Sequence, residues 1–295
     1  MNRRGLAATV VIAGALATVT WWRLRPRPPK IGAAVGLSAV EPGPLFVGDV
    51  PPVPASRSRG CGAGGGKAVG RAFSVEARKF FVWGPADDGH EKPIVLAFHG
   101  WGSNGRQFEE WFTMEKHVDQ DTYVVYPDAQ GDNWDYEGSR DIDFVTAMLD
   151  VMASTYCVDR RHVLALGFSY GGRFVNHLGC RAPSLVRGIV VAGSRWDSSE
   201  TTCASPIPVL VVHRTHDETM PIRGGRDAAA RWAKLLGCTA NRPIANGCIG
   251  YTGCQAGAVT FCEDLHFDPE WPESWNHTMR EPYQDLAWQW FQQLR

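Results

Sequence analysis

A serine flanked by glycines is the first feature of this 295-residue chain that suggests chemistry. The run Gly167-Phe168-Ser169-Tyr170-Gly171-Gly172 has the form G-x-S-x-G; it follows the apolar stretch VLAL and precedes a helix-like segment. A sharp turn between a strand and a helix exposes such a serine at the top of a sheet, and the glycines let neighbouring backbone approach. We therefore predict that Ser169 is a nucleophile. The alternative is a serine in an ordinary glycine-rich turn or helix cap.

A serine hydroxyl needs a base to take its proton and an acid to orient that base. With a G-x-S-x-G nucleophile, the chain order is serine, acid, histidine. The apolar run 208–212 leads into a loop with Asp217, which we predict to be the acid; the alternatives are Glu218, or an Asp217 that only caps a turn. His266 and His277 follow, and we favour His277 as the base because it lies just before the last predicted helix.

The negatively charged oxygen of a tetrahedral intermediate needs N–H groups that already point at it. One donor is predicted to be the backbone amide of Tyr170, directly after the serine. The second is predicted to be the amide of Trp101, in the glycine-flanked turn His99-Gly100-Trp101-Gly102 that follows the apolar run 93–98. His99 is expected to shape this loop rather than to transfer protons. A turn selected only for its tightness is the alternative.

The elements that must position these residues alternate between strand and helix. Short apolar strands are predicted at 77–83, 93–98, 122–126, 163–166, 188–192 and 208–212, and helices at 107–117, 141–156, 173–178, 226–236 and 282–294. This alternation predicts a mainly parallel sheet with helices on both faces. The active site is then expected beyond the carboxyl ends of the strands.

The first seventy residues are predicted to lie outside this fold. Residues 1–22 join Arg3 and Arg4 to an uncharged apolar run, which indicates an export signal; the arginines after Trp22 leave open that residues 5–22 are a membrane anchor. Residues 23–70 are rich in proline and glycine without an apolar period, which predicts a linker before a catalytic domain at 71–295. We expect a secreted or extracytoplasmic protein.

The composition agrees with an exported enzyme. The chain is 44% hydrophobic and 21% charged with a formal net charge of −1, which excludes disordered and coiled-coil proteins and suggests no nucleic-acid partner. Eight cysteines in an exported chain are expected to form disulfides, and since none stands in a Cys-x-x-Cys pair, no zinc site is expected. Four of them, from Cys238 to Cys262, are predicted to hold together a segment with little periodicity.

Several of these motifs together resemble a known family. The HGWG loop, GFSYGG, the His216-Asp217 loop with its Pro221, and His277-Thr278 before an aromatic-rich last helix are similar to the secreted polyhydroxybutyrate-depolymerase and feruloyl-esterase group of α/β-hydrolases. Members of that group read Gly-His-Thr-Trp-Pro around the histidine, of which this chain keeps His-Thr. The resemblance implies an α/β-hydrolase domain that hydrolyses carboxylic esters through a serine acyl-enzyme, without metal or organic cofactor.

Tryptophans suggest the kind of substrate. The chain has 12, and flat rings in loops near strand ends suit sugar faces, cinnamoyl rings or a polyester; Trp101, Trp134 and Trp275 are predicted to contact the substrate. We expect a monomer that acts on a polymeric substrate, either feruloyl or acetyl esters of plant cell-wall polysaccharide or a polyhydroxyalkanoate. A serine peptidase of the oligopeptidase type and a non-catalytic hydrolase-like binding protein are the alternatives.

Overall fold

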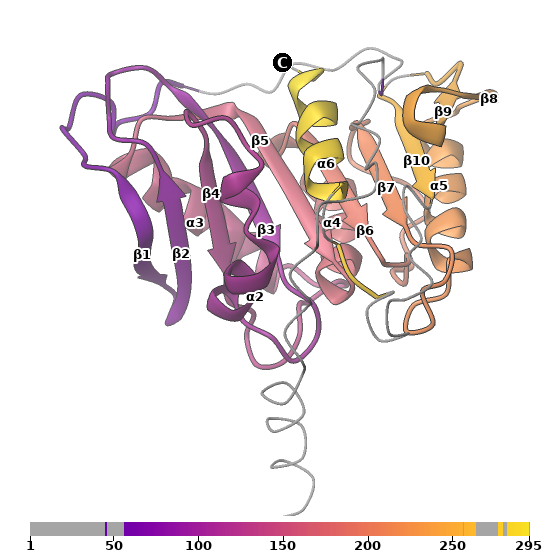
Figure 1. Ribbon diagram of the computed structural model, residues 1–295, viewed down its shortest axis with the longest axis horizontal. Coiled ribbons are helices and arrows are strands. Elements are labelled where there is room, and N and C mark those ends of the chain that lie inside the picture. Colours follow the sequence, from indigo (N-terminus) through magenta and orange to yellow (C-terminus); the bar gives the residue numbers. More distant parts are fainter. Residues whose placement is uncertain (1–44, 46–55, 256, 264–276, 280–281, 295) are drawn as a thin grey trace, which may run out of the picture. The chain divides into compact units, whose positions relative to one another are not determined.

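Ten strands form one sheet in the computed structural model, which describes residue 45 and residues 56–255, 257–263, 277–279 and 282–294. Their order across the sheet is β1-β2-β4-β3-β5-β6-β7-β10-β9-β8 (Figure 1). The strands are β1 Ala68–Val75, β2 Arg78–Gly84, β3 Lys92–Phe98, β4 Tyr123–Pro127, β5 Val158–Phe168, β6 Gly188–Ala192, β7 Val209–His213, β8 Ala240–Pro243, β9 Ile249–Thr252 and β10 Val259–Glu263. Residues 1–22, His266 and Trp275 lie outside the described residues.

The middle of the sheet is parallel and its two edges are antiparallel. Neighbours from β4 through β3, β5, β6 and β7 to β10 run in the same direction, whereas β2 and β1 on one side and β9 and β8 on the other run antiparallel to their neighbours. The central strands are continuous apolar runs, and β6, β7 and β4 are buried along their whole length. Strands buried on both faces read in this way because helices cover both sides. The mainly parallel sheet predicted from the sequence is confirmed.

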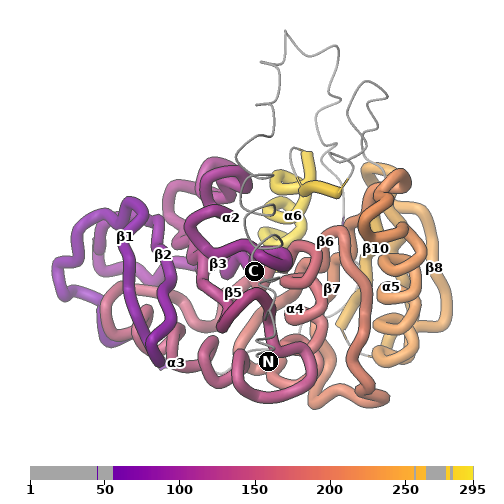
Figure 2. The backbone as a smooth tube through the Cα atoms, turned by 90° about the horizontal axis from the view of Figure 1, so that it is seen from below, coloured from indigo at the N-terminus to yellow at the C-terminus, as the bar shows by residue number. Residues whose placement is uncertain are grey.

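Helices cover both faces of the sheet (Figures 1 and 2). They are α2 Gly105–Phe112, α3 Arg140–Thr155, α4 Tyr170–Arg181, α5 Arg223–Leu235 and α6 Tyr283–Gln292. Side chains of α3, α4 and α5 belong to one buried cluster, and side chains of α2 and α6 to the other. Successive side chains of β3 point to opposite faces of the sheet. Ile94 and Leu96 belong to the first cluster, and Val95 and Ala97 to the second.

The helix predicted at 107–117 is divided in the structure. Helix α2 ends at Phe112, because Thr113 adopts the left-handed conformation with φ of 46°, and a short 3₁₀ helix, Met114–Lys116, follows. The side chain of Asn104 starts the helix by accepting a hydrogen bond from the backbone N–H of Gln107 at 2.9 Å. This capped start places α2 directly after the loop that follows β3.

Disulfides hold the segment from residue 238 to 262, as predicted, and the segment also extends the sheet. Cys238 is bonded to Cys254 and Cys248 to Cys262. Three strands, β8, β9 and β10, were not predicted there because the segment lacks apolar alternation, and all four residues of β8 are exposed. The remaining pairs are Cys61–Cys157 and Cys180–Cys203, so all eight cysteines are paired.

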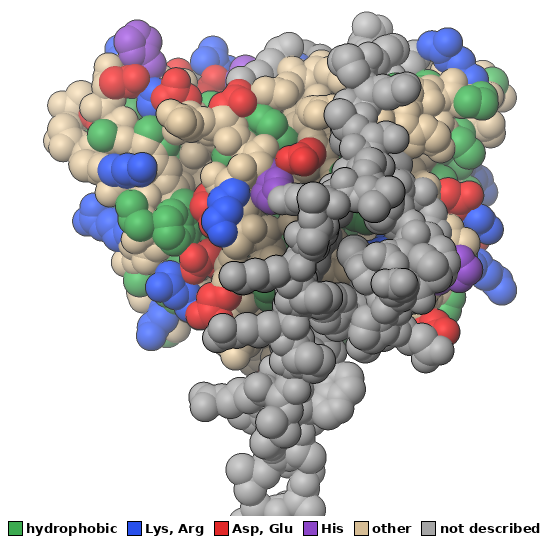
Figure 3. Space-filling model, viewed as in Figure 1, with side chains coloured by type: hydrophobic (Ala, Val, Ile, Leu, Met, Phe, Trp, Pro, Cys, Tyr) green, Lys and Arg blue, Asp and Glu red, His purple; other side chains and the backbone are tan. Residues whose placement is uncertain are grey.

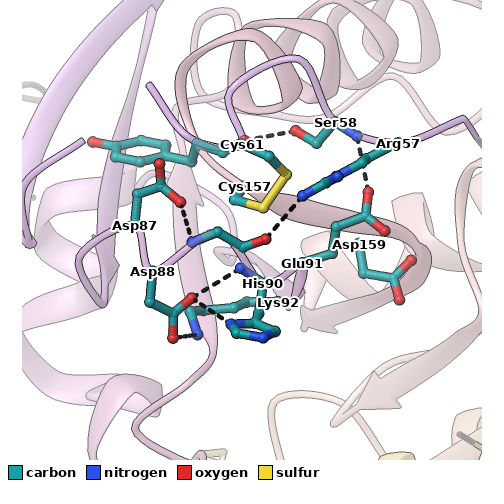
Figure 4. Close-up of a disulfide and its surroundings, with 12 residues drawn as sticks. Arg57, Ser58, Cys61, Asp87, Asp88, His90, Glu91, Lys92, Cys157 and Asp159 are labelled. Atoms are coloured by element: carbon teal, nitrogen blue, oxygen red, sulfur yellow. Dashed lines mark hydrogen bonds and ion pairs between the residues drawn. A yellow bond between two sulfur atoms is a disulfide. The ribbon is translucent and has the colours of Figure 1, made fainter. Parts of the chain in front are cut away.

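The compact part of the chain begins before the predicted boundary at residue 71. Strand β1 starts at Ala68, and Cys61 is already bonded to Cys157 at the start of β5 (Figure 4). Ser58 donates from its hydroxyl to the carbonyl of Tyr156 at 2.6 Å and from its backbone N–H to Glu91 at 2.8 Å. Hydrogen bonds and a disulfide attach residues 58–61 to the domain. These residues lack apolar periodicity, which is why the sequence predicts a linker there.

The described surface carries charges of both signs. In the view of Figure 3, basic and acidic side chains alternate over the coloured area without a basic field, in agreement with the net charge of −1. Within the described ranges, no helix has both the length and the apolar character needed to cross a bilayer. The segment 5–22, predicted as a signal or an anchor, is not among those residues.

Candidate active site

Ser169 lies at the carboxyl end of β5, between that strand and α4, with φ of 54° and ψ of −116°. A residue with a side chain adopts such a backbone conformation only where its surroundings hold it there. Two hydrogen bonds do so: the N–H of Ser169 donates to Ala192 at 2.9 Å, and its carbonyl accepts from the hydroxyl of Ser194 at 2.6 Å. Neighbouring strand β6 and the loop after it thus fix the strained turn.

Two glycines of the G-x-S-x-G motif are required by close approach of backbone. A Cβ on Gly167 would collide with the carbonyl oxygen of Gly171, and a Cβ on Gly171 would collide with the carbonyl oxygen of Phe98 at the end of β3. Gly167 therefore lets the turn fold back on itself, and Gly171 lets α4 start against the end of β3, the neighbour of β5 in the sheet. This is the strand-turn-helix context that the sequence predicted.

Asp217 lies in the loop after β7, and its side chain is almost completely buried. One carboxylate oxygen accepts a hydrogen bond from the N–H of Met220 at 2.8 Å, and the N–H of Asp217 donates to Arg214 at 3.2 Å. These bonds close the loop around the carboxylate. The second oxygen is left to face the histidine of the last described loop.

His277 connects the acid to the serine. Its Nδ1 lies 2.7 Å from Oδ2 of Asp217, and its Nε2 lies 2.9 Å from Oγ of Ser169. A carboxylate only accepts hydrogen bonds, so Nδ1 carries the proton and Nε2 is free to accept the hydroxyl proton. The structure thus brings together the three residues predicted from motif and chain order, in an arrangement that can remove the proton from Ser169 as its oxygen attacks.

Two neighbours of this row were not predicted. The ring of Phe168 packs against the ring of His277 with centroids 4.7 Å apart. His213, the last residue of β7, is buried; its Nε2 donates to the carbonyl of Met220 at 2.7 Å and lies 3.6 Å from Asp217. Burial lowers the pKa of His213, so the imidazole is neutral. The sequence signal for this contact is the position of His213, at the end of a predicted strand and four residues before Asp217.

The loop after β3 lies beside Ser169. A Cβ on Gly100 would lie 3.3 Å from the Cβ of Ser169, so the turn that carries Trp101 begins next to the serine. Tyr170 is the first residue of α4, where an N–H has no acceptor within its own helix and where the helix dipole favours negative charge. Donation by the amides of Trp101 and Tyr170 remains a prediction.

His99 anchors this loop, as expected. Its Nδ1 donates to the carbonyl of Gly100 at 2.7 Å, and its Nε2 accepts from the N–H of Ala129 at 3.2 Å. One donor and one acceptor make the ring neutral, and burial lowers the pKa of His99 to about 4. The ring therefore joins the ends of β3 and β4 without carrying charge.

The comparisons with known proteins agree with this geometry. No protein-family model matches the chain. It is 27% identical over 220 residues to a probable feruloyl esterase C from Aspergillus clavatus, covering 70% of this chain and 75% of the relative. It is 25% identical over 228 residues to feruloyl esterase D from Neurospora crassa, covering 69% of this chain and 79% of the relative. The structure of acetyl xylan esterase from Aspergillus awamori superposes with a TM-score of 0.55 at 15% identity, over 75% of this chain and 98% of that one.

The chain is similar to feruloyl esterases and has the α/β-hydrolase fold. The esterase is accordingly a carboxylic ester hydrolase with the α/β-hydrolase fold predicted from its sequence.

The aromatic residues predicted to contact substrate have different positions in this esterase. Trp101 is 59% exposed on the loop beside Ser169. Trp134 is instead 2% exposed: its ring stacks on Phe174, and its Nε1 donates to the carbonyl of His99 at 2.9 Å. Most of this ring therefore packs in the core beneath the loops, and contact of Trp134 with substrate stays a prediction. Trp275 lies outside the described residues.

Proposed function

We propose that this esterase is an extracellular serine hydrolase that cleaves feruloyl or acetyl esters of plant cell-wall polysaccharide through an acyl-enzyme. The observation that carries the proposal is the hydrogen-bonded row from Asp217 through His277 to Ser169, with distances of 2.7 and 2.9 Å. The substrate class is supported by the feruloyl esterases to which the chain is similar.

In the first half of the proposed reaction, Oγ of Ser169 attacks the ester carbonyl while Nε2 of His277 takes its proton. The carbonyl oxygen becomes an oxyanion, which the amides of Tyr170 and Trp101 would stabilise. The intermediate collapses, the ester bond breaks, and the departing alcohol oxygen takes the proton from His277. Asp217 holds the imidazole in the required tautomer and stabilises its transient positive charge.

In the second half, water replaces the alcohol. His277 takes a proton from this water as its oxygen attacks the acyl-enzyme carbonyl. Collapse of the second tetrahedral intermediate breaks the bond to Oγ, and the proton returns from His277 to Ser169. The carboxylic acid leaves, and the balance is one ester and one water converted into one acid and one alcohol.

An extracellular location is supported by disulfides. All eight cysteines are paired, a pattern typical of proteins that fold in oxidising compartments. The apolar run in residues 1–22 would act as the export signal, and the residues between it and the folded domain as the linker. We place the end of that linker before Leu45, since Leu45 is buried, its N–H donates to Gln293 and its carbonyl accepts from the hydroxyl of Thr260.

The mechanism is tested by Ser169→Ala, with Ser205→Ala as the matched control. Ser205 is exposed, and within the described part of the chain its hydroxyl bonds only to the adjacent carbonyl of Ala204. Ser169→Ala should lower p-nitrophenyl acetate hydrolysis by at least about a thousandfold and abolish labelling by a fluorophosphonate probe. Ser205→Ala should retain both. If Ser169→Ala keeps more than a few percent of the wild-type rate, the serine assignment is wrong.

The substrate class is tested by one panel on one preparation: methyl ferulate, acetylated xylan, polyhydroxybutyrate and a chromogenic peptide. Hydrolysis of the first or second is expected. Cleavage of the peptide alone would indicate a serine peptidase, and a protein that neither cleaves nor reacts with the probe would be a binding protein. Preference for polyhydroxybutyrate would move the substrate from polysaccharide esters to polyesters.

A further inference from the structure

A polar hollow of about 300 Å³ lies in the loop that follows β4. All of its lining lies between residues 130 and 140: Gln130, Asp132, Asn133, Trp134, Asp135, Tyr136, Glu137 and Arg140. The carboxyl ends of β4 and β3 lie at the same edge of the sheet, because these two strands are parallel neighbours. The loop that forms the hollow therefore leaves the sheet at the same edge as the loop that carries Trp101.

Two contacts connect the hollow to the predicted oxyanion donors. The N–H of Gly102, next to Trp101, donates to the carbonyl of Asp132 at 3.0 Å. On the other side, the guanidinium of Arg173 lies 3.8 Å from the ring centre of Tyr170 and 5.7 Å from that of Tyr136. The hollow is thus linked to the Trp101 loop through Gly102 and to Tyr170 through Arg173.

The chemistry of the lining selects the kind of group. Carboxylates accept hydrogen bonds from hydroxyls and repel anions, and the amide of Asn133 and the guanidinium of Arg140 add donors. A cinnamoyl ring has few groups to satisfy these side chains, whereas a sugar presents several hydroxyls. The exposed ring of Trp101 at the neighbouring turn offers a flat surface for the C–H face of a sugar.

The size is also suitable. A volume of about 300 Å³ corresponds to about ten water molecules, which is near the number of heavy atoms in one pentose. The hollow lies at the small end of ligand pockets in general. It can therefore accept one sugar residue, while the rest of a polysaccharide would extend over the surface.

We propose that this hollow binds the sugar on the alcohol side of the scissile ester, an inference that rests on the proposed esterase function. Asp132 and Tyr136 are the side chains assigned to the sugar hydroxyls. Among the described residues, neither the carboxylate of Asp132 nor the hydroxyl of Tyr136 has a hydrogen-bond partner or ion pair. Asp135, by contrast, is occupied, since it accepts from the N–H of Gly138 at 2.8 Å.

The test compares two esters with the same acyl group, methyl ferulate and feruloyl arabinose, in wild type, in Asp132→Asn with Tyr136→Phe, and in a control. Asp150→Asn is the matched control because it removes an exposed carboxylate on α3, which among the described residues pairs only with Arg160. The double variant should lower kcat/KM for feruloyl arabinose relative to methyl ferulate by about tenfold or more, through loss of two hydrogen bonds. The control should leave this ratio as in wild type. An unchanged ratio in the double variant would overturn the inference.

A binding measurement separates this inference from the proposed function. Xylan oligosaccharides and arabinose are titrated into Ser169→Ala, with and without the two hollow substitutions, and followed by calorimetry or NMR. Saturable binding of either sugar that the hollow substitutions abolish supports the site even if no ester is cleaved. Binding that they leave unchanged places the sugar elsewhere, even if the esterase activity is confirmed.

Discussion

At the scale of single residues, the site depends on backbone that approaches unusually closely. Ser169 adopts a positive φ, and Gly171 packs against the carbonyl of Phe98, the residue before the loop that carries Trp101. The serine, the start of α4 and the end of β3 are therefore set by one contact. Any group added there has to move either the nucleophile or the loop.

Gly171→Ala should consequently lower activity, although alanine normally stabilises a helix more than glycine does. The added Cβ would collide with a backbone oxygen that no side-chain rotation can move. We expect a decrease of about a hundredfold in kcat/KM for p-nitrophenyl acetate, the size of effect that a displacement of about 1 Å produces in an active site. Gly66→Ala is the control, since a Cβ there meets nothing within 4 Å. Wild-type activity in Gly171→Ala would show that the turn adjusts.

Motif and chain order were sufficient to predict that the side chains of Ser169, Asp217 and His277 meet, because the order of the three is a property of the fold. The orientation of an aromatic ring cannot be predicted from motif and chain order. Trp134 follows a strand end like Trp101, yet its indole turns inward against Phe174 while that of Trp101 faces solvent. The role of His213 beside Asp217 was also missed, because spacing alone does not show which atoms a buried imidazole contacts.

At the scale of elements, β5 places a disulfide at one of its ends and the predicted nucleophile at the other. Cys157 precedes this strand and bonds to Cys61, whereas Ser169 follows it. Eleven residues of strand place the two ends roughly 35 Å apart. The central strands were predictable since they are continuous apolar runs. The edge strands β1 and β8 were not, because neither is a continuous buried apolar run: half of β1 and all of β8 are exposed.

Removal of the Cys61–Cys157 disulfide should therefore affect stability and not catalysis. Cys61→Ser with Cys157→Ser should lower the free energy of unfolding by about 2–4 kcal/mol while kcat/KM stays within about twofold of wild type. Cys238→Ser with Cys254→Ser is the comparison, because it opens a separation of 16 residues instead of 96. Chain entropy makes the longer loop worth about 1.6 kcal/mol more. Urea unfolding measures both; a loss of activity in the first variant would contradict the separation of roles.

At the scale of the whole molecule, buried neutral histidines make folding depend on pH. His99 joins the ends of β3 and β4, and His213 supports the acid loop; burial lowers the pKa of both. Protonation of either ring would put a charge where the fold provides one donor and one acceptor for His99 and a carbonyl acceptor for His213. Loss of the native state at acid pH should thus begin at the edge of the sheet that carries the catalytic residues.

The expected direction follows from proton binding. The pKa of His99 falls from 6.5 in the unfolded chain to about 4 in the folded one, so between these values the unfolded state binds more protons. The contribution of neutral His99 to the free energy of unfolding is fully present above pH 6.5 and is lost as the pH falls toward 4. It amounts to about 3 kcal/mol. His99→Asn should be less stable than wild type at pH 7.5 but should lose less of its unfolding free energy on acidification. Urea titrations at pH 7.5 and 4 measure the difference, with disulfides intact. The exposed His90→Asn is the control and should keep the wild-type pH dependence; an equally steep loss in His99→Asn would show that other groups dominate.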